Sequence, residues 1–180
     1  MKKYFILLIC LTVVFGMVQS VSAVSYTNTV DIDKWLSGEG TWSWTQPVTP
    51  DFSVPPDILN SATLTIEAWF VDGSNDVVSV QGQAVGTLNN GVFSWTNLLA
   101  ISSTTFSIGG AFTGVNGWVS GTPLTVALNY DERGLFGLNS LYLDTSTLTV
   151  NYTNVPEPAS MLLLGLGLVG LAAAKRKFRN

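Results

Sequence analysis

An alternation of apolar and polar residues, with a period of two, constrains the fold of this chain most. In residues 63–70 every second position is apolar, and Thr65 and Glu67 lie between the apolar positions. Residues 124–130 and 147–152 repeat the pattern. This is the period of a strand with one buried face and one solvated face. Residues 24–154 show no convincing apolar repeat at helical spacing, so we predict an all-β domain.

Turn-forming residues separate the predicted strands. Clusters of Gly, Asn, Asp, Ser and Pro occupy residues 72–75, 89–91, 109–110, 116–117 and 121–123. Strands that recur about every 8 to 12 residues between such turns indicate an antiparallel β-sandwich, which we expect to be of jelly-roll type. Four prolines in residues 47–60 predict a long surface connection there.

The N-terminus is typical of a secretory signal peptide. Lys2 and Lys3 precede an apolar stretch over residues 4–18, and small residues at 21–23 suit a signal peptidase. We therefore predict a signal peptide over residues 1–23, cleaved after Ala23, which removes the only cysteine. The chain also contains no histidine. A Ser/His/Asp or Cys/His nucleophile is thereby excluded from the mature protein.

The predicted exported domain, residues 24–154, is strongly acidic. It holds eleven acidic residues and only two basic ones, Lys34 and Arg133, which gives a net charge of −9. The other basic residues lie in the two terminal segments. A negative, base-poor surface argues against nucleic acid and anionic lipid as partners of this domain. It is compatible with neutral glycans or divalent cations.

The last segment, residues 155–180, has three parts. Pro156 and Pro158 prevent a regular helix at its start. Residues 159–174 carry no charge and make roughly 24 Å of helix, against a hydrocarbon core of about 30 Å. We predict a short transmembrane helix over about 159–174. Basic residues follow it and favour the cytoplasmic side: Lys175, Arg176, Lys177 and Arg179.

This tail resembles the PEP-CTERM sorting signal of Gram-negative bacteria that make exopolysaccharide. The resemblance covers Pro156, Glu157 and Pro158, the apolar helix and the terminal basic cluster, in that order. It implies recognition by an exosortase, inner-membrane anchoring through the helix before sorting, and then a place at the cell surface or in the extracellular matrix. The same tail sometimes carries the name of the ice-binding protein C-terminal domain, which does not imply ice binding.

Acidic residues suggest one metal site and no catalytic site. Asp72, Asn75 and Asp76 offer oxygen ligands within one short loop, as calcium prefers. Asp, Gly and Asn are also ordinary turn residues, and we favour the turn interpretation. For glycoside hydrolysis, nothing in the sequence pairs any two of Glu39, Glu67 and Glu132. We therefore expect no enzyme activity and no cofactor apart from the candidate calcium ion.

Six tryptophans lie in the predicted domain. Trp42 and Trp44 share one face of a predicted strand, and Trp118 lies in a loop rich in Gly and Asn, where exposure is most expected. Indole rings stack on sugars, so these three are candidate carbohydrate contacts. Large aromatic residues more often fill a core, and we favour that interpretation for most of the tryptophans.

Two functions follow from these observations. The first is a non-catalytic surface or matrix protein, sorted by an exosortase, with a structural or adhesive role in exopolysaccharide or biofilm. The alternative is a carbohydrate-binding module that uses exposed tryptophans. The expected partners are signal peptidase, exosortase, the membrane through the C-terminal helix, and exopolysaccharide, but not nucleic acid.

Overall fold

The computed structural model describes residues 22–71, 75–90, 101–113, 118–132, 140–155, 165–167 and 170. One compact unit comprises Ala23–Thr153, which we call the β-domain. The residues on both sides of it form a second unit. In that second unit, residues 165–167 and 170 are helical.

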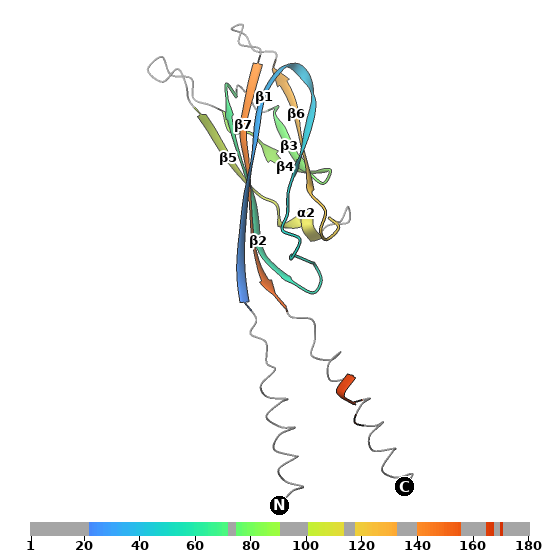
Figure 1. The fold of residues 1–180 in the computed structure, drawn as a ribbon. Helices are drawn as coiled ribbons and strands as arrows, with labels where there is room; N and C mark the ends of the chain where they lie inside the picture. Colours follow the sequence, from blue (N-terminus) through green and yellow to red (C-terminus); the bar gives the residue numbers. More distant parts are fainter. Residues whose placement is uncertain are drawn as a thin grey trace, which may run out of the picture. The chain divides into compact units, whose positions relative to one another are not determined.

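Strands make up nearly all of the regular structure in the described part of the β-domain (Figure 1). They are β1 (Ser22–Gln46), β2 (Ile58–Trp69), β3 (Val77–Val80), β4 (Gln83–Thr87), β5 (Ile101–Ser107), β6 (Leu124–Glu132) and β7 (Ser140–Asn154), with the short helix α2 (Gly109–Thr113) after β5. The all-β prediction is confirmed. The alternating segments 63–70, 124–130 and 147–152 fall almost entirely within β2, β6 and β7.

The strands form one antiparallel sheet in the order β4-β3-β6-β1-β7-β2-β5. The long strand β1 joins the two halves of this sheet. Its second half pairs with β6, from Gly38 opposite Glu132 to Gln46 opposite Leu124. Its first half lies beside β7. Between the halves β1 bends, with positive φ at Asp33 (48°) and Gly38 (73°), and turns over as Figure 1 shows.

Because of this bend, the two halves of the sheet face each other and the domain is barrel-like. The edge strands β4 and β5 meet through side chains. A Cβ atom added at Gly86 would lie 3.0 Å from the Phe106 ring, and the Asn89 N–H donates to Thr104 Oγ1 at 2.8 Å. The prediction was of a sandwich, whereas the structure has a single sheet continuous through β1. A jelly-roll connectivity stays a prediction.

The core lies between the two halves of the sheet. The inward residues of β2 and β7 include Leu64, Ile66, Leu148 and Val150, and all four are fully buried. The other half contributes Val78, Val80, Leu124, Val126 and Leu128. Each such side chain stabilises the fold by about 1.5–3 kcal/mol relative to an exposed one. The polar residues between them therefore face outward, as the alternation predicts.

The β-domain has two distinguishable ends. At one, which we call the proximal end, β1 begins and β7 ends; at the other, the distal end, β1 bends (Figure 1). At the proximal end the segment 47–60, predicted to be a surface connection, carries the fully buried Phe52. That segment therefore also closes the end of the core. Its prolines set local backbone geometry without keeping the whole segment on the surface.

Candidate functional site

The residues of the predicted sorting signal lie outside the described residues. This holds for Pro156, Glu157 and Pro158, and for the basic cluster Lys175, Arg176, Lys177 and Arg179. Of the predicted transmembrane helix, 159–174, only residues 165–167 and 170 are described. Among them, the side chain of Leu166 is exposed. In the portion of the chain that is described, no helix has the length and apolar character needed to cross a membrane.

Trp118 was expected to be exposed, and that expectation was wrong. Only 7% of its surface is accessible. Its indole stacks on Phe52 at a centroid distance of 5.2 Å and meets Phe112 edge-on at 5.1 Å. The indole Nε1–H donates to the carbonyl of Thr122 at 2.6 Å. Gly121, with a φ of 77°, lies in the turn that brings Thr122 back to the indole, so this tryptophan fills the core rather than facing solvent.

Trp42 and Trp44 also face the interior side of β1. Trp44 is 8% exposed, and Trp42 is half-buried against the core. Their rings stack at 5.4 Å. The core interpretation therefore describes Trp44 and, in part, Trp42. A carbohydrate contact through either ring remains an untested prediction.

The candidate calcium loop is only partly described, because Asp72 lies outside the described residues. Asn75 is exposed whereas Asp76 is buried. The Val77 N–H donates to the Asn75 carbonyl (3.0 Å) in a tight turn, and the Leu88 N–H donates to the Asp76 carbonyl (3.0 Å), which extends the pairing of β3 with β4. Among the residues described, no group of three or more His, Cys, Asp or Glu is placed to hold a metal ion.

The three glutamates considered for catalysis lie in different parts of the domain. Glu67 is on the outer side of β2, where it accepts a hydrogen bond from Thr145 Oγ1 at 3.2 Å. Glu132 points into the interior and is fully buried. Glu39 is exposed on β1. The fold therefore places these three carboxyl groups in separate environments.

A cluster that the sequence analysis did not identify lies at the distal end. We call Trp35, Phe70 and Tyr142, together with Asp33, the distal cluster. Trp35 is 57% exposed. Its ring lies 5.8 Å from that of Phe70, nearly parallel at 24°, and 4.9 Å from that of Tyr142, tilted by 44°. Trp35 in β1, Tyr142 in β7 and Phe70 directly after β2 bring these rings together.

Backbone geometry and one hydrogen bond hold the distal cluster. Phe70, directly after β2, has a φ of 64°, which is unusual for a bulky residue. This backbone turn directs its ring toward Trp35 rather than into the core. Tyr142 Oη–H donates to Asp33 Oδ1 at 2.8 Å. That hydrogen bond, followed by desolvation and by the negative charges of Asp33 and Asp144, raises the pKa of Tyr142.

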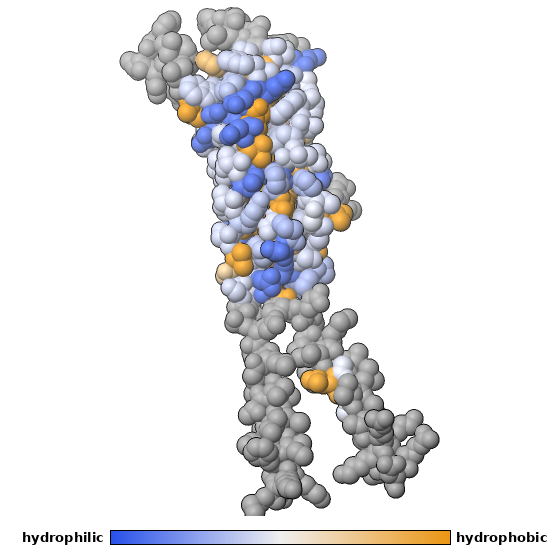
Figure 2. All heavy atoms as spheres, in the orientation of Figure 1, coloured by the Kyte–Doolittle hydropathy of each residue, from blue (hydrophilic) through white to orange (hydrophobic). Residues whose placement is uncertain are grey.

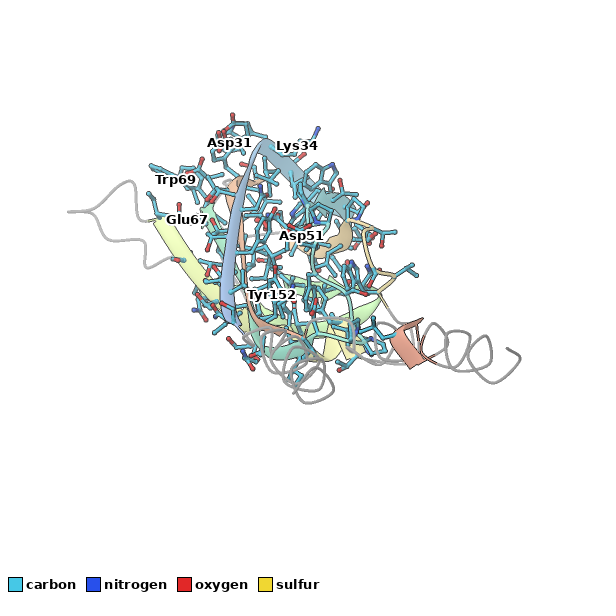
Figure 3. All side chains as sticks on the ribbon, turned by 60° about the horizontal axis from the view of Figure 1, so that its bottom comes forward. Asp31, Lys34, Asp51, Glu67, Trp69 and Tyr152 are labelled. Carbon is cyan, nitrogen blue, oxygen red and sulfur yellow. The ribbon has the colours of Figure 1, made fainter. Side chains whose placement is uncertain are left out.

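The parity of residues in β1 is the signal that could have revealed Trp35. Leu36, Trp42 and Trp44 lie at even positions and face the interior. Trp35 lies at an odd position, directly after the charged residues Asp33 and Lys34. Because successive side chains of a strand point to opposite faces, an odd position here means exposure. Figure 3 shows Asp31 and Lys34 at this bend, and Glu67 and Trp69 on the outer side of β2.

Below the distal cluster, the outer side of the same half of the sheet is covered with hydroxyl groups. Thr65 and Thr147 are opposite each other on β2 and β7, and Thr29 on β1 extends the row. Neighbouring hydroxyls pair at 2.9 Å between Thr29 and Thr147 and between Thr65 and Thr105. Figure 2 shows a face on which weakly polar residues predominate and apolar ones are scattered. We call this the hydroxyl face.

Comparisons with known proteins give one firm finding. The PEP-CTERM protein-sorting motif matches residues 154–177. No curated protein matched the sequence. A beta-porphyranase of glycoside hydrolase family 86 from the human gut bacterium Bacteroides plebeius shows structural similarity, with a TM-score of 0.44 and 14% sequence identity. The match covers 76% of this chain and 22% of that enzyme, and similarity at this level carries no argument about activity.

Proposed function

We propose that this chain, which carries a PEP-CTERM protein-sorting motif at residues 154–177, is a non-catalytic protein of the cell surface or extracellular matrix. The motif supports sorting to the surface by an exosortase, and it is the observation that carries the proposal. In this role the segment 155–180 anchors the precursor in the inner membrane until it is sorted. The β-domain then serves as a structural or adhesive module within exopolysaccharide.

Two properties of the β-domain support a passive role. Its sequence lacks histidine, the commonest general base, and its three glutamates lie in separate environments. The surface is strongly acidic, which favours solubility in a hydrated matrix and disfavours binding to anionic lipid or nucleic acid. A passive role of this kind requires no cofactor.

Mass spectrometry of the mature protein, isolated from its host, tests the proposal. Processing at both ends would give an N-terminus at Val24 and a C-terminus near Pro158. Replacing Pro156, Glu157 and Pro158 with alanine should leave the full tail attached and keep the protein in the membrane fraction. Pro50→Ala, an exposed proline of the β-domain, is the matched control. An intact Lys175–Asn180 tail on surface-exposed wild-type protein would overturn the proposal.

A carbohydrate-binding module is the second candidate. The original candidates for sugar contact do not favour it, because Trp118 and Trp44 are buried. The observation that does favour it is the exposed indole of Trp35 at the distal end. This candidate is compatible with surface sorting, since a matrix protein can be retained by the glycan that it binds.

A further inference from the structure

We propose that the distal cluster is a binding platform for a neutral polysaccharide, with Trp35 as the stacking residue. This inference rests on the proposed function, because it names the ligand class through which a surface-sorted domain would be retained. It concerns residues that the sequence analysis did not select.

The first argument is the contrast among the tryptophans. In the described residues, Trp44 and Trp118 are buried and Trp42 and Trp69 are half-buried, whereas more than half of Trp35 faces solvent. An indole in water forfeits the stabilisation that burial would give it. Its face is broad and apolar, which suits the apolar face of a pyranose ring. Phe70 packs nearly parallel to the indole ring and Tyr142 packs against it at an angle.

The second argument is the backbone. Asp33 and Phe70 are two of the three non-glycine residues with positive φ in the described chain, and both belong to this cluster. Asp33 lies in β1 and Phe70 directly follows β2, so the unfavourable geometry arises twice, in separate segments that meet at one place. Backbone strain of this kind persists where the surrounding structure enforces it, and it concentrates at binding sites. Here it holds three aromatic rings at a fixed position on the surface.

The third argument identifies the ligand as neutral. Asp31 and Asp33 are exposed at the bend, Asp144 lies near Tyr142, and Lys34 is the nearby base among the residues that the structure describes. This excess of negative charge repels an anionic glycan. Carboxylates are instead good acceptors for sugar hydroxyls, and Asp33 has acceptor capacity beyond the one bond from Tyr142.

The hydroxyl face extends the platform. Glu67 and Thr145 lie between the aromatic rings and the rows of threonine. The Thr145 hydroxyl donates a hydrogen bond to the Glu67 carboxylate. A chain of sugar residues that stacks on Trp35 would therefore continue over groups that donate and accept hydrogen bonds. This arrangement suits a polysaccharide better than an isolated monosaccharide.

Affinity electrophoresis of the full chain in detergent tests the proposal. The gels contain hydroxyethyl cellulose, galactomannan or xyloglucan, with alginate as the anionic comparison. We expect at least one neutral polymer to retard the protein and alginate not to do so. Trp35→Ala should weaken that binding about tenfold or more, the loss expected for one stacking contact. Trp35→Phe should retain part of it.

Ile58→Ala is the matched control, because Ile58 is 57% exposed, as Trp35 is, but lies at the proximal end. It should bind as the wild type does. Retardation by no neutral polymer, retardation by alginate alone, or unchanged binding by Trp35→Ala would each overturn the proposal. The proposal would also be overturned if the wild type bound no glycan but formed a dimer that Trp35→Ala converts to a monomer. The cluster would then be a contact between copies of the chain.

The outcome is separable from that of surface sorting. The termini and the fractionation of the mature protein report on sorting and do not depend on Trp35. A protein processed at both ends that binds no neutral glycan would overturn the platform alone. A protein that binds glycan but keeps its tail would overturn the sorting proposal alone.

Discussion

The β-domain carries an aromatic cluster at each end, and the two differ in exposure. At the proximal end, Phe52, Phe112, Trp118 and Tyr152 are all buried, with Phe52 ringed by the other three at 4.8–5.5 Å. At the distal end, Trp35 lies on the surface. Similar residue types thus close the core at one end and remain available to a ligand at the other. Composition alone does not separate a core residue from a binding residue; position in the sheet does.

Removing the centre of the proximal cluster should have the largest effect on stability. Phe52→Ala leaves a cavity among three rings and should lower the free energy of unfolding by about 3–5 kcal/mol. Chemical denaturation followed by tryptophan fluorescence measures this. Ile58→Ala, an exposed apolar residue close in sequence, should change it by no more than about 0.5 kcal/mol. Equal midpoints for the two variants would mean that the proximal cluster is not part of the core.

A smaller loss is expected when Trp118 keeps an aromatic ring but loses its indole N–H. Trp118→Phe removes the hydrogen bond to the Thr122 carbonyl and some packing volume, and should cost about 1–2 kcal/mol. The same denaturation experiment applies. Glycan binding should be unaffected, because the residue is buried at the end opposite Trp35. A loss of glycan binding at unchanged stability would indicate that Trp118 is exposed and would contradict the structure.

Alkaline titration should distinguish the two ends by the cause of their tyrosine shifts. The pKa of Tyr142 is raised mainly by its hydrogen bond to Asp33, and the pKa of Tyr152 mainly by burial, then by the charge of Asp51. In both cases the folded state holds the proton more tightly than the unfolded chain. Their contribution to stability is therefore complete below pH about 10, the unfolded value, and is lost as pH rises through each folded pKa.

Ultraviolet absorbance of phenolate measures these titrations, and Tyr142→Phe and Tyr152→Phe assign them. Asp33→Asn should lower the pKa of Tyr142 toward its ordinary value and leave that of Tyr152 unchanged. Asparagine accepts positive φ, so this variant keeps the bend. A Tyr142 pKa that does not respond to Asp33→Asn would contradict the hydrogen bond as the main cause.

The smallest effect on stability is expected at Trp35. Because the ring is largely exposed, Trp35→Ala should lower the free energy of unfolding by at most about 1 kcal/mol, from its contacts with Phe70 and Tyr142. A loss comparable to that of Phe52→Ala would show that the two clusters have the same role. Near-ultraviolet circular dichroism should meanwhile show that the remaining tryptophans keep their environment.

The alternation of apolar and polar residues predicted the strands that it covers, because this pattern can be recognised from adjacent residues alone. It predicted most of β6 and the central parts of β2 and β7. It did not predict that β1 would continue from Ser22 to Gln46 and join both halves of the sheet. That continuity depends on a bend at Asp33 and Gly38, and a bend looks the same in sequence as the end of a strand.

The aromatic clusters were harder to predict, because their partners are distant in sequence. Trp118 is buried through Phe52, and nothing near Trp118 indicates that contact. Phe70 continues the apolar alternation of β2, yet a positive φ directs it to Trp35 instead. Trp35 itself was accessible to sequence reasoning through its odd position in β1. The sorting motif was predicted in full, since its three parts are contiguous.

The position of β1 beside β7 has a mechanical consequence. These strands are neighbours that run in opposite directions, and each spans the distance between the proximal end and the distal cluster. A pull applied between a polymer held at Trp35 and an attachment at the proximal end acts along the strands. The hydrogen bonds between β1 and β7 then resist sliding together, in shear, and do not open one after another. The domain is thus oriented to withstand tension along its long direction.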